Sequence, residues 1–302
     1  MPTIHSYASP GPGSVNNYWI ETERGLLVID AQRQISHAKT AFGQMAALGK
    51  PVLAIFLTHE HPDHIGGTDV FAAGSAVPIY ASAQTRSNIQ RDERGFIALA
   101  GRVLGSDFPE AVTLPTHTLE PGQVIEIDEV GLQIYEAGAG EAASMTVLHV
   151  EGSDVLFSAD LIANGMTPFL MEGRLGAWIA QLEALRTAFP HVRTIYPGHG
   201  PVGPASALID AQLEYLNFFY GLVVEAVAED TPLTAGKKAA IVFAMEERYP
   251  GHPPVAEIPG LLELGIEPVV RELLARSAGD QGGTRAKPGS ADTDRPELES
   301  DE

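Results

Sequence analysis

An apolar run, VLAIFLT (52–58), ends directly on a cluster of titratable residues, HEHPDH (59–64). A continuous apolar run of this length is typical of a β-strand that is covered on both faces. The cluster then follows at the carboxyl end of that strand, where open α/β folds place their ligands. The pattern therefore predicts an α/β fold with a functional site at this strand end.

The order of residues within the cluster suits a divalent metal ion. His59 and His61 lie two positions apart, so their side chains point the same way in extended backbone. Pro62 keeps His61 out of the helical region, and Asp63 and His64 then begin a helix. Three neutral imidazoles and a carboxylate suit zinc or a similar metal. The spacing differs from the His-Glu-x-x-His helix of zinc proteases.

Composition removes several other classes of site. The 302 residues include no cysteine, which excludes disulfides, thiolate ligands and iron–sulfur clusters. The net charge of −20 repels phosphate backbones and argues against nucleic acid as partner or substrate. The N-terminus lacks a basic stretch followed by an apolar run, and no window reaches the ~18 apolar residues of a membrane span. We therefore expect a cytoplasmic protein that acts on a small molecule, without a membrane partner; its oligomeric state stays open.

The chain divides into a mixed α/β part and a helical part. Strands are expected at 15–21, 25–30, 52–58, 124–127, 131–136, 144–150, 154–158 and 192–196. Helices are expected at 37–49, 64–73, 83–104, 176–188, 205–228, 234–247 and 258–276. We predict an α/β domain over 1–204 and a helical C-terminal region packed on it over 205–277. Residues 278–302 are acidic with almost no apolar side chains, which predicts a disordered tail.

Two residues far from the cluster are candidates for the same site. A metal ion needs four or more ligands, so the cluster alone does not complete a metal site. Asp160 stands at the end of the apolar run VLFSADLI, and His199 stands in IYPGHGP, a strand end that turns through glycines. Each residue alone is more often part of a turn. Together with the cluster they become candidate ligands.

This combination of motifs resembles the metallo-β-lactamase superfamily. THEHPDH (58–64) matches its His-x-His-x-Asp-His signature, and Asp160 and His199 match its later blocks in order and setting over roughly residues 14–204. The resemblance implies a four-layer αββα sandwich with a two-metal site at one edge, here with a helical C-terminal extension. It also implies the ligands: His59 and His61 for the first metal, Asp63, His64 and His199 for the second, and Asp160 bridging both.

The chain departs from the family at the third ligand of the first metal, which relatives supply as a histidine. Here the corresponding loop contains Glu141, 19 residues before Asp160, whereas His149 lies within a strand only 11 residues before Asp160. We therefore expect Glu141 to be the ligand and His149 to face away; the alternative is a first site that has lost its metal. The added carboxylate hardens the ligand set, so we expect two divalent ions, zinc first, with manganese or iron as competitors.

Two metals in such a site hold a bridging hydroxide that attacks an electrophile, and Asp63 is placed to orient this nucleophile. We expect hydrolysis of a small, fairly apolar ester, lactone or thioester, since two segments carry apolar residues for a pocket: Phe96, Leu104, Phe108, Met166, Phe169, Leu170, Met171 and Trp178. Arg174 and Arg193, the cations near the later motifs, are expected at the surface. The alternatives are a β-lactam hydrolase, a mononuclear iron sulfur dioxygenase and a non-catalytic metal-binding module.

Overall fold

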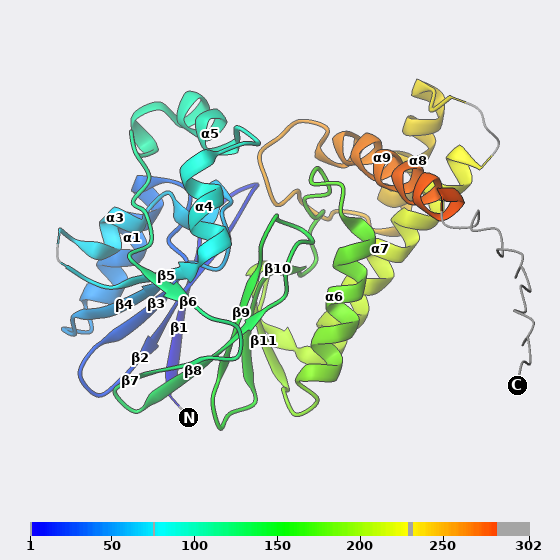
Figure 1. Cartoon of the computed structure of the whole chain (residues 1–302). Helices are drawn as coiled ribbons and strands as arrows, with labels where there is room; N and C mark the ends of the chain where they lie inside the picture. Colours follow the sequence, from blue (N-terminus) through cyan, green and yellow to red (C-terminus); the bar gives the residue numbers. More distant parts are fainter. Residues whose placement is uncertain (1, 75, 229–231, 283–302) are drawn as a thin grey trace, which may run out of the picture.

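The computed structural model describes residues 2–74, 76–228 and 232–282, and in it two β-sheets face each other (Figure 1). The first sheet has the strand order β1 (Thr3–Ala8), β2 (Asn16–Glu21), β3 (Leu26–Ile29), β4 (Val52–Phe56), β5 (Ile79–Ser82) and β6 (His117–Leu119). The second has the order β12 (Gly203–Pro204), β11 (Thr194–His199), β10 (Val155–Ala163), β9 (Thr146–Val150), β8 (Val130–Glu136) and β7 (Val124–Ile127). Strands β3 to β6 are parallel, and so are β10 and β11.

Helices cover the outer side of each sheet. On the first sheet lie α1 (Ile35–Ala46) and α3 (Thr68–Ala72), and on the second lie α6 (Leu175–Ala188) and α7 (Ala205–Val227) (Figure 1). At the upper edge of Figure 1 are α4 (Ala83–Arg91) and α5 (Phe96–Leu104), and the C-terminal helices are α8 (Ala235–Arg248) and α9 (Leu261–Gly282). The short helices are α2 (Pro62–Ile65) and the 3-10 turn η1 (Gly105–Asp107). The predicted αββα sandwich with a helical C-terminal region is confirmed.

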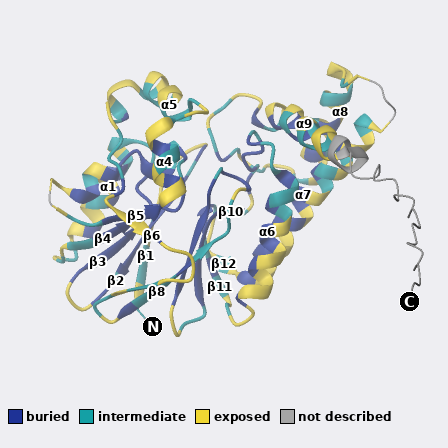
Figure 2. Cartoon of the chain, in the orientation of Figure 1, coloured by how far each residue is buried: buried dark blue, intermediate teal, exposed yellow. Residues whose placement is uncertain are grey.

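Side chains that point alternately to the two faces of each sheet explain the four layers. In β3, Leu27 and Ile29 pack against residues of β8, β9 and β10 in the core between the sheets. Leu26 and Val28 point the other way, into the cluster formed with α1 and α3. Both faces of this strand are therefore buried, which is why its sequence is apolar throughout. Figure 2 shows the same pattern across the molecule, with buried strands between helices whose outer faces are exposed.

Two predicted helices are each divided in two. The helix expected over 64–73 is divided at Gly66 and Gly67, where a Cβ atom would lie 2.1 Å from the backbone oxygen of Arg33 or Ala31. The chain therefore passes too close to the segment after β3 for any other residue type. The helix expected over 83–104 is divided between Asp92 and Gly95, which both have positive φ. Strands β1, β5, β6 and β12 were not predicted, and the last three of them are only two to four residues long.

The C-terminal helices share a hydrophobic cluster with the second sheet. Phe219 of α7, Met245 of α8 and Ile266 of α9 belong to the same cluster as Trp178 of α6. Helix α9 extends to Gly282, so its end enters the segment predicted as a tail, while residues 283–302 lie outside the described residues. Within the described residues, no helix is long and apolar enough to cross a membrane.

Candidate metal centre

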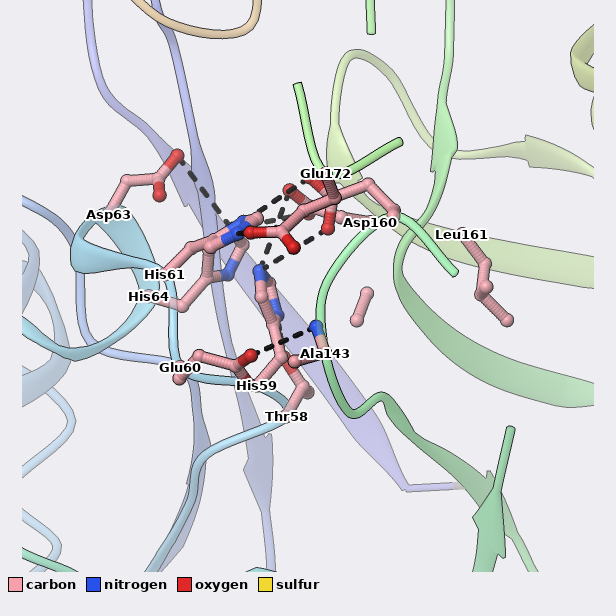
Figure 3. Close-up of polar contacts among 12 residues, drawn as sticks. Thr58, His59, Glu60, His61, Asp63, His64, Ala143, Asp160, Leu161 and Glu172 are labelled. Atoms are coloured by element: carbon pink, nitrogen blue, oxygen red, sulfur yellow. Dashed lines mark hydrogen bonds and ion pairs between the residues drawn. The ribbon is translucent and has the colours of Figure 1, made fainter. Parts of the chain in front are cut away.

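The histidine cluster begins where strand β4 ends. The backbone of His61 is extended, with φ −65° and ψ 143°, and Pro62 then begins helix α2. This is the strand–turn–helix conformation expected from the sequence. It allows His59 and His61 to face one group of side chains while His64 reaches a neighbouring group from α2 (Figure 3).

Side chains of the types that bind metals gather in two groups that share Asp160. Within each group, the candidate ligand atoms all lie within 4.8 Å of one another. The first group is His59, His61, Glu141 and Asp160, and the second is Asp63, His64, Asp160 and His199. The structure thus brings together every residue that was named from the sequence as a ligand. All of them are buried except Asp63, which is partly exposed.

The donor set fits a pair of cations. Buried atoms without a hydrogen-bond partner include Nε2 of His59 and His64, both carboxylate oxygens of Glu141, and Oδ1 of Asp160. An unpartnered buried polar atom costs about 1–3 kcal/mol, so such a concentration of them is unfavourable unless something binds them. Imidazole nitrogen and carboxylate oxygen are ligands of divalent zinc, manganese and iron. The residues present therefore fit two divalent ions.

Asp160 reaches the centre from an irregular point in strand β10. Its neighbour Ala159 has a φ of 48°, and the pairing of β10 with β11 shifts register on either side of Ala159. A β-bulge of this kind turns a side chain in a new direction. Gly198 lies opposite, where a Cβ atom would come within 1.8 Å of Oδ1 of Asp160. A residue with a side chain at position 198 would therefore displace Asp160.

His199 is oriented by a contact with the backbone. Its Nδ1 donates a hydrogen bond of 2.6 Å to the carbonyl oxygen of Ser14. Its Nε2 is then left to face Oδ2 of Asp160 at 3.1 Å and Oδ2 of Asp63 at 3.3 Å. The imidazole thus presents an unprotonated nitrogen to the second group when it is neutral.

Asp30, which sequence reasoning missed, orients His64 in a similar way. It is buried at the end of β3 and accepts hydrogen bonds from the backbone N–H and the hydroxyl of Thr58. Its Oδ2 lies 2.8 Å from Nδ1 of His64. The sequence signal was available, because Asp30 ends the apolar run GLLVID just as Asp160 follows one.

Glu60 holds the loop that carries Glu141. It belongs to the histidine cluster in sequence but to neither metal-binding group. Its carboxylate instead accepts a hydrogen bond from the backbone N–H of Ala143 at 2.9 Å (Figure 3). It also accepts one from the hydroxyl of Ser144 at 3.2 Å. His149 faces away, as predicted, because its ring contacts Gln133, Ser153 and His191.

Glu172 was also missed by sequence reasoning. Its side chain is buried, and Oε1 lies 3.9 Å from Nε2 of His61, on the side of the ring opposite Glu141. Arg174 pairs with it at 2.7 Å and Arg94 at 3.6 Å. Arg174 was expected to be a surface charge, but it compensates this buried carboxylate. A carboxylate behind a ligating histidine is a common feature of metal sites, because it fixes the ring orientation.

The charged groups of the centre perturb one another strongly. Burial raises the pKa of Glu141 to about 7, although the charge of His61 opposes this effect. Burial lowers the pKa of His199, but the carboxylates of Asp160 and Asp63 outweigh it and raise the value to about 10. Burial would raise the pKa of Asp160, but the charges of His199 and His64 hold it well below its usual range. Without a metal, the centre therefore retains protons that metal binding would displace.

An apolar pocket of about 130 Å³ opens above the centre. Of the apolar residues predicted to form a pocket, Phe96, Leu104 and Phe169 line it. Leu170 and Trp178 instead belong to the core against the second sheet. The C-terminal segment 255–258, which the sequence did not suggest, forms a further part of the wall.

The sequence and fold of the chain are similar to those of known hydrolases. The metallo-β-lactamase type 2 of Elizabethkingia meningoseptica is 23% identical over 62% of this chain and 69% of its own length. The linear primary-alkylsulfatase of Pseudomonas sp. (strain ATCC 19151) is 30% identical over 60% of this chain, which spans only 40% of that relative. A β-lactamase domain protein from Burkholderia ambifaria aligns with a TM-score of 0.68 at 20% identity, over 92% of this chain and 88% of its own.

A family model covers the part of the chain that builds the centre. The model of the metallo-β-lactamase superfamily matches residues 10–199, from the segment before β2 to the last candidate ligand, His199. This range is more than half of the chain and includes both groups of ligand-type side chains. The chain therefore belongs to the metallo-β-lactamase superfamily.

Proposed function

We propose that this chain is a metal-dependent hydrolase of small, largely apolar carboxylic esters, lactones or thioesters. The observation that carries the proposal is the position of the two ligand groups, which share Asp160 and lie at the base of a pocket with apolar walls. Asp63, Glu141, Asp160 and His199 all line that pocket. A bound molecule would therefore lie next to the metals.

We assign the ligands as the two groups indicate. His59, His61 and Glu141 would hold the first ion, Asp63, His64 and His199 the second, and Asp160 would contact both. Such a pair supplies Lewis-acid polarisation of the scissile carbonyl and activates water at neutral pH. We propose zinc as the preferred metal. Manganese and iron would compete with it, because Glu141 adds an oxygen ligand where relatives have nitrogen.

The chain's own residues position the reactants. Asp63 is the only partly exposed member of the two groups, and its carboxylate faces the pocket. We propose that it accepts a hydrogen bond from the attacking water and so directs the water toward the substrate. Phe96 and Phe169 pack against the ring of His61, with ring centroids 5.8 and 5.1 Å away, and exclude bulk water from that side.

A second candidate is hydrolysis of alkyl sulfate esters. It is supported by the similarity to a linear primary-alkylsulfatase and by Arg33, the one arginine or lysine among the residues that line the pocket. The Nε atom of Arg33 is buried without a hydrogen-bond partner, while its other end pairs with Glu257. A guanidinium group in this position would favour an anionic substrate.

Metal analysis combined with a substrate panel tests both candidates. We expect two divalent ions per chain, and turnover of aryl esters or lactones that chelators abolish and zinc or manganese restores. The panel also contains alkyl sulfates, a β-lactam and phosphodiesters. Preference for alkyl sulfates would favour the second candidate, and preference for the β-lactam would favour a β-lactamase. One iron with oxygen uptake would indicate a dioxygenase, and protein without metal or turnover would contradict the proposal.

A further inference from the structure

Helix α5 is apolar but is not part of the core. Its sequence, FIALAGRVL, contains no charged residue except Arg102, yet none of its residues is buried. Leu99 is 40% exposed and Val103 is 73% exposed. Figure 2 shows the helix at the edge of the molecule, with little of the fold packed around it. Exposed apolar residues that form one continuous surface usually mark a binding site.

The exposed surface of α5 continues into the pocket above the metal centre. Phe96, Leu99, Ala100, Val103 and Leu104 recur at the spacing of one helix face, and all of them line that pocket. The face begins at the centre itself, because the ring of Phe96 lies against His61. From there it leads outward to Val103, seven residues and about 10 Å along the helix axis.

The segment between α8 and α9 forms the opposite wall. Figure 1 shows this segment reaching from the C-terminal helices toward α5. It is held by backbone hydrogen bonds from Thr167 to Pro253 and from Val255 to Thr167. Val255 and Ile258 add apolar surface to the pocket, and Glu257 pairs at 2.9 Å with Arg33, which also lines the pocket. The pocket is thus a channel with two apolar walls and the metal centre at its base.

We propose that α5 binds a linear aliphatic chain of the substrate, with the bond to be cleaved at the metal centre. This inference rests on the proposed function. It identifies the aliphatic chain of the substrate as the part that the protein recognises. The pocket of about 130 Å³ accommodates the beginning of such a chain, and the remainder lies over Leu99 and Val103. The continuity of this surface with the metal centre favours substrate over a partner protein or a second copy of the chain.

The test measures kcat/KM for p-nitrophenyl esters from acetate to dodecanoate on the metal-loaded protein. Each methylene that is moved from water onto apolar surface should raise kcat/KM roughly fourfold, until the chain extends past Val103. In Val103→Asp and Leu99→Ser, the ratio of the decanoate to the acetate value should fall roughly tenfold. Phe243→Ser is the matched control, because Phe243 is 64% exposed on α8 and does not line the pocket.

A flat chain-length profile, or a ratio unchanged in both α5 variants, would overturn the inference even if esters are hydrolysed. If no ester is hydrolysed, the proposed function fails, and calorimetric titration with dodecanoate still tests α5. If Val103→Asp binds dodecanoate more weakly than the wild type and Phe243→Ser do, the proposed site for the aliphatic chain on α5 is supported. Equal binding would contradict it. If the protein is a dimer that Val103→Asp converts to a monomer in light scattering, α5 is an interface, and the inference is wrong.

Discussion

Oδ2 of Asp30 lies 2.8 Å from Nδ1 of His64. A residue outside the second group of candidate ligands therefore orients one of its members. The contact fixes Nδ1 as the side of the ring that faces the β3 strand end. Nε2 then faces Oδ1 of Asp160 at 3.2 Å. A carboxylate in this position determines the ring orientation and increases the basicity of the ligating nitrogen.

Asp30→Asn should therefore weaken metal binding. We expect the affinity of the second site to fall about 10- to 100-fold, because a neutral amide is a poorer acceptor for the imidazole N–H. Competition with a chromogenic chelator measures the affinity, and circular dichroism checks the fold. Asp210→Asn is the control, since Asp210 is an exposed residue of α7 that pairs with Arg186. Equal affinity in Asp30→Asn and the control would show that Asp30 has only a structural role.

Substitutions at Glu141 should distinguish the two metals. We expect Glu141→Ala to retain one ion per chain where the wild type binds two, because it removes an oxygen ligand from the first group. Glu141→His should bind two zinc ions, because imidazole is an effective zinc ligand. Elemental analysis of dialysed protein gives the stoichiometry. His149→Ala should match the wild type, and loss of metal in that variant would refute the assignment of this loop.

Glu60→Ala should loosen the loop around Glu141. The variant loses the acceptor for the N–H of Ala143 and the hydroxyl of Ser144, so the loop is no longer tied to the histidine cluster. We expect faster amide exchange over residues 137–145 and lower occupancy of the first metal, with the second retained. Hydrogen-exchange mass spectrometry and elemental analysis measure these effects. Glu93→Ala provides an exposed control, and equal exchange in the two variants would contradict the prediction.

Glu172→Gln should affect the first metal through His61. The amide keeps the size of the side chain but removes the charge that lies 3.9 Å behind the ring. We expect weaker binding of the first ion. Burial lowers the pKa of His61, but Glu141 and Glu172 outweigh it, so this pKa should also fall in ¹⁵N NMR titrations of the metal-free variant. Arg174 and Arg94 lose their charge partner, so Tm should also fall. A lower Tm with an unchanged His61 pKa and unchanged metal affinity would mean that Glu172 is only structural.

Local chain geometry accounts for what the sequence determined by itself. Three local features could be recognised from the sequence alone, because each depends on only a few neighbouring residues. They are the apolar run before His59, the proline after His61 and the helix start at His64. Local patterns by themselves predicted an α/β fold with a metal site after the strand 52–58. The four-layer sandwich and the assignment of ligands to two metals came from the resemblance to the metallo-β-lactamase superfamily over residues 14–204. The same resemblance pointed to Glu141, which lies at the sequence distance from Asp160 where relatives have a histidine ligand.

Only the tertiary structure decided which residues support these ligands. Asp30 meets His64 because β3 and β4 are parallel neighbours, and both strands end at the same edge of the sheet. Glu60 meets the loop of Glu141 across more than eighty residues of sequence. Helix α5 has the sequence of a core helix, yet none of its residues is buried and one of its faces lines the pocket. Local patterns encode backbone conformation, whereas contacts between distant segments and the exposure of a helix face depend on how the layers pack.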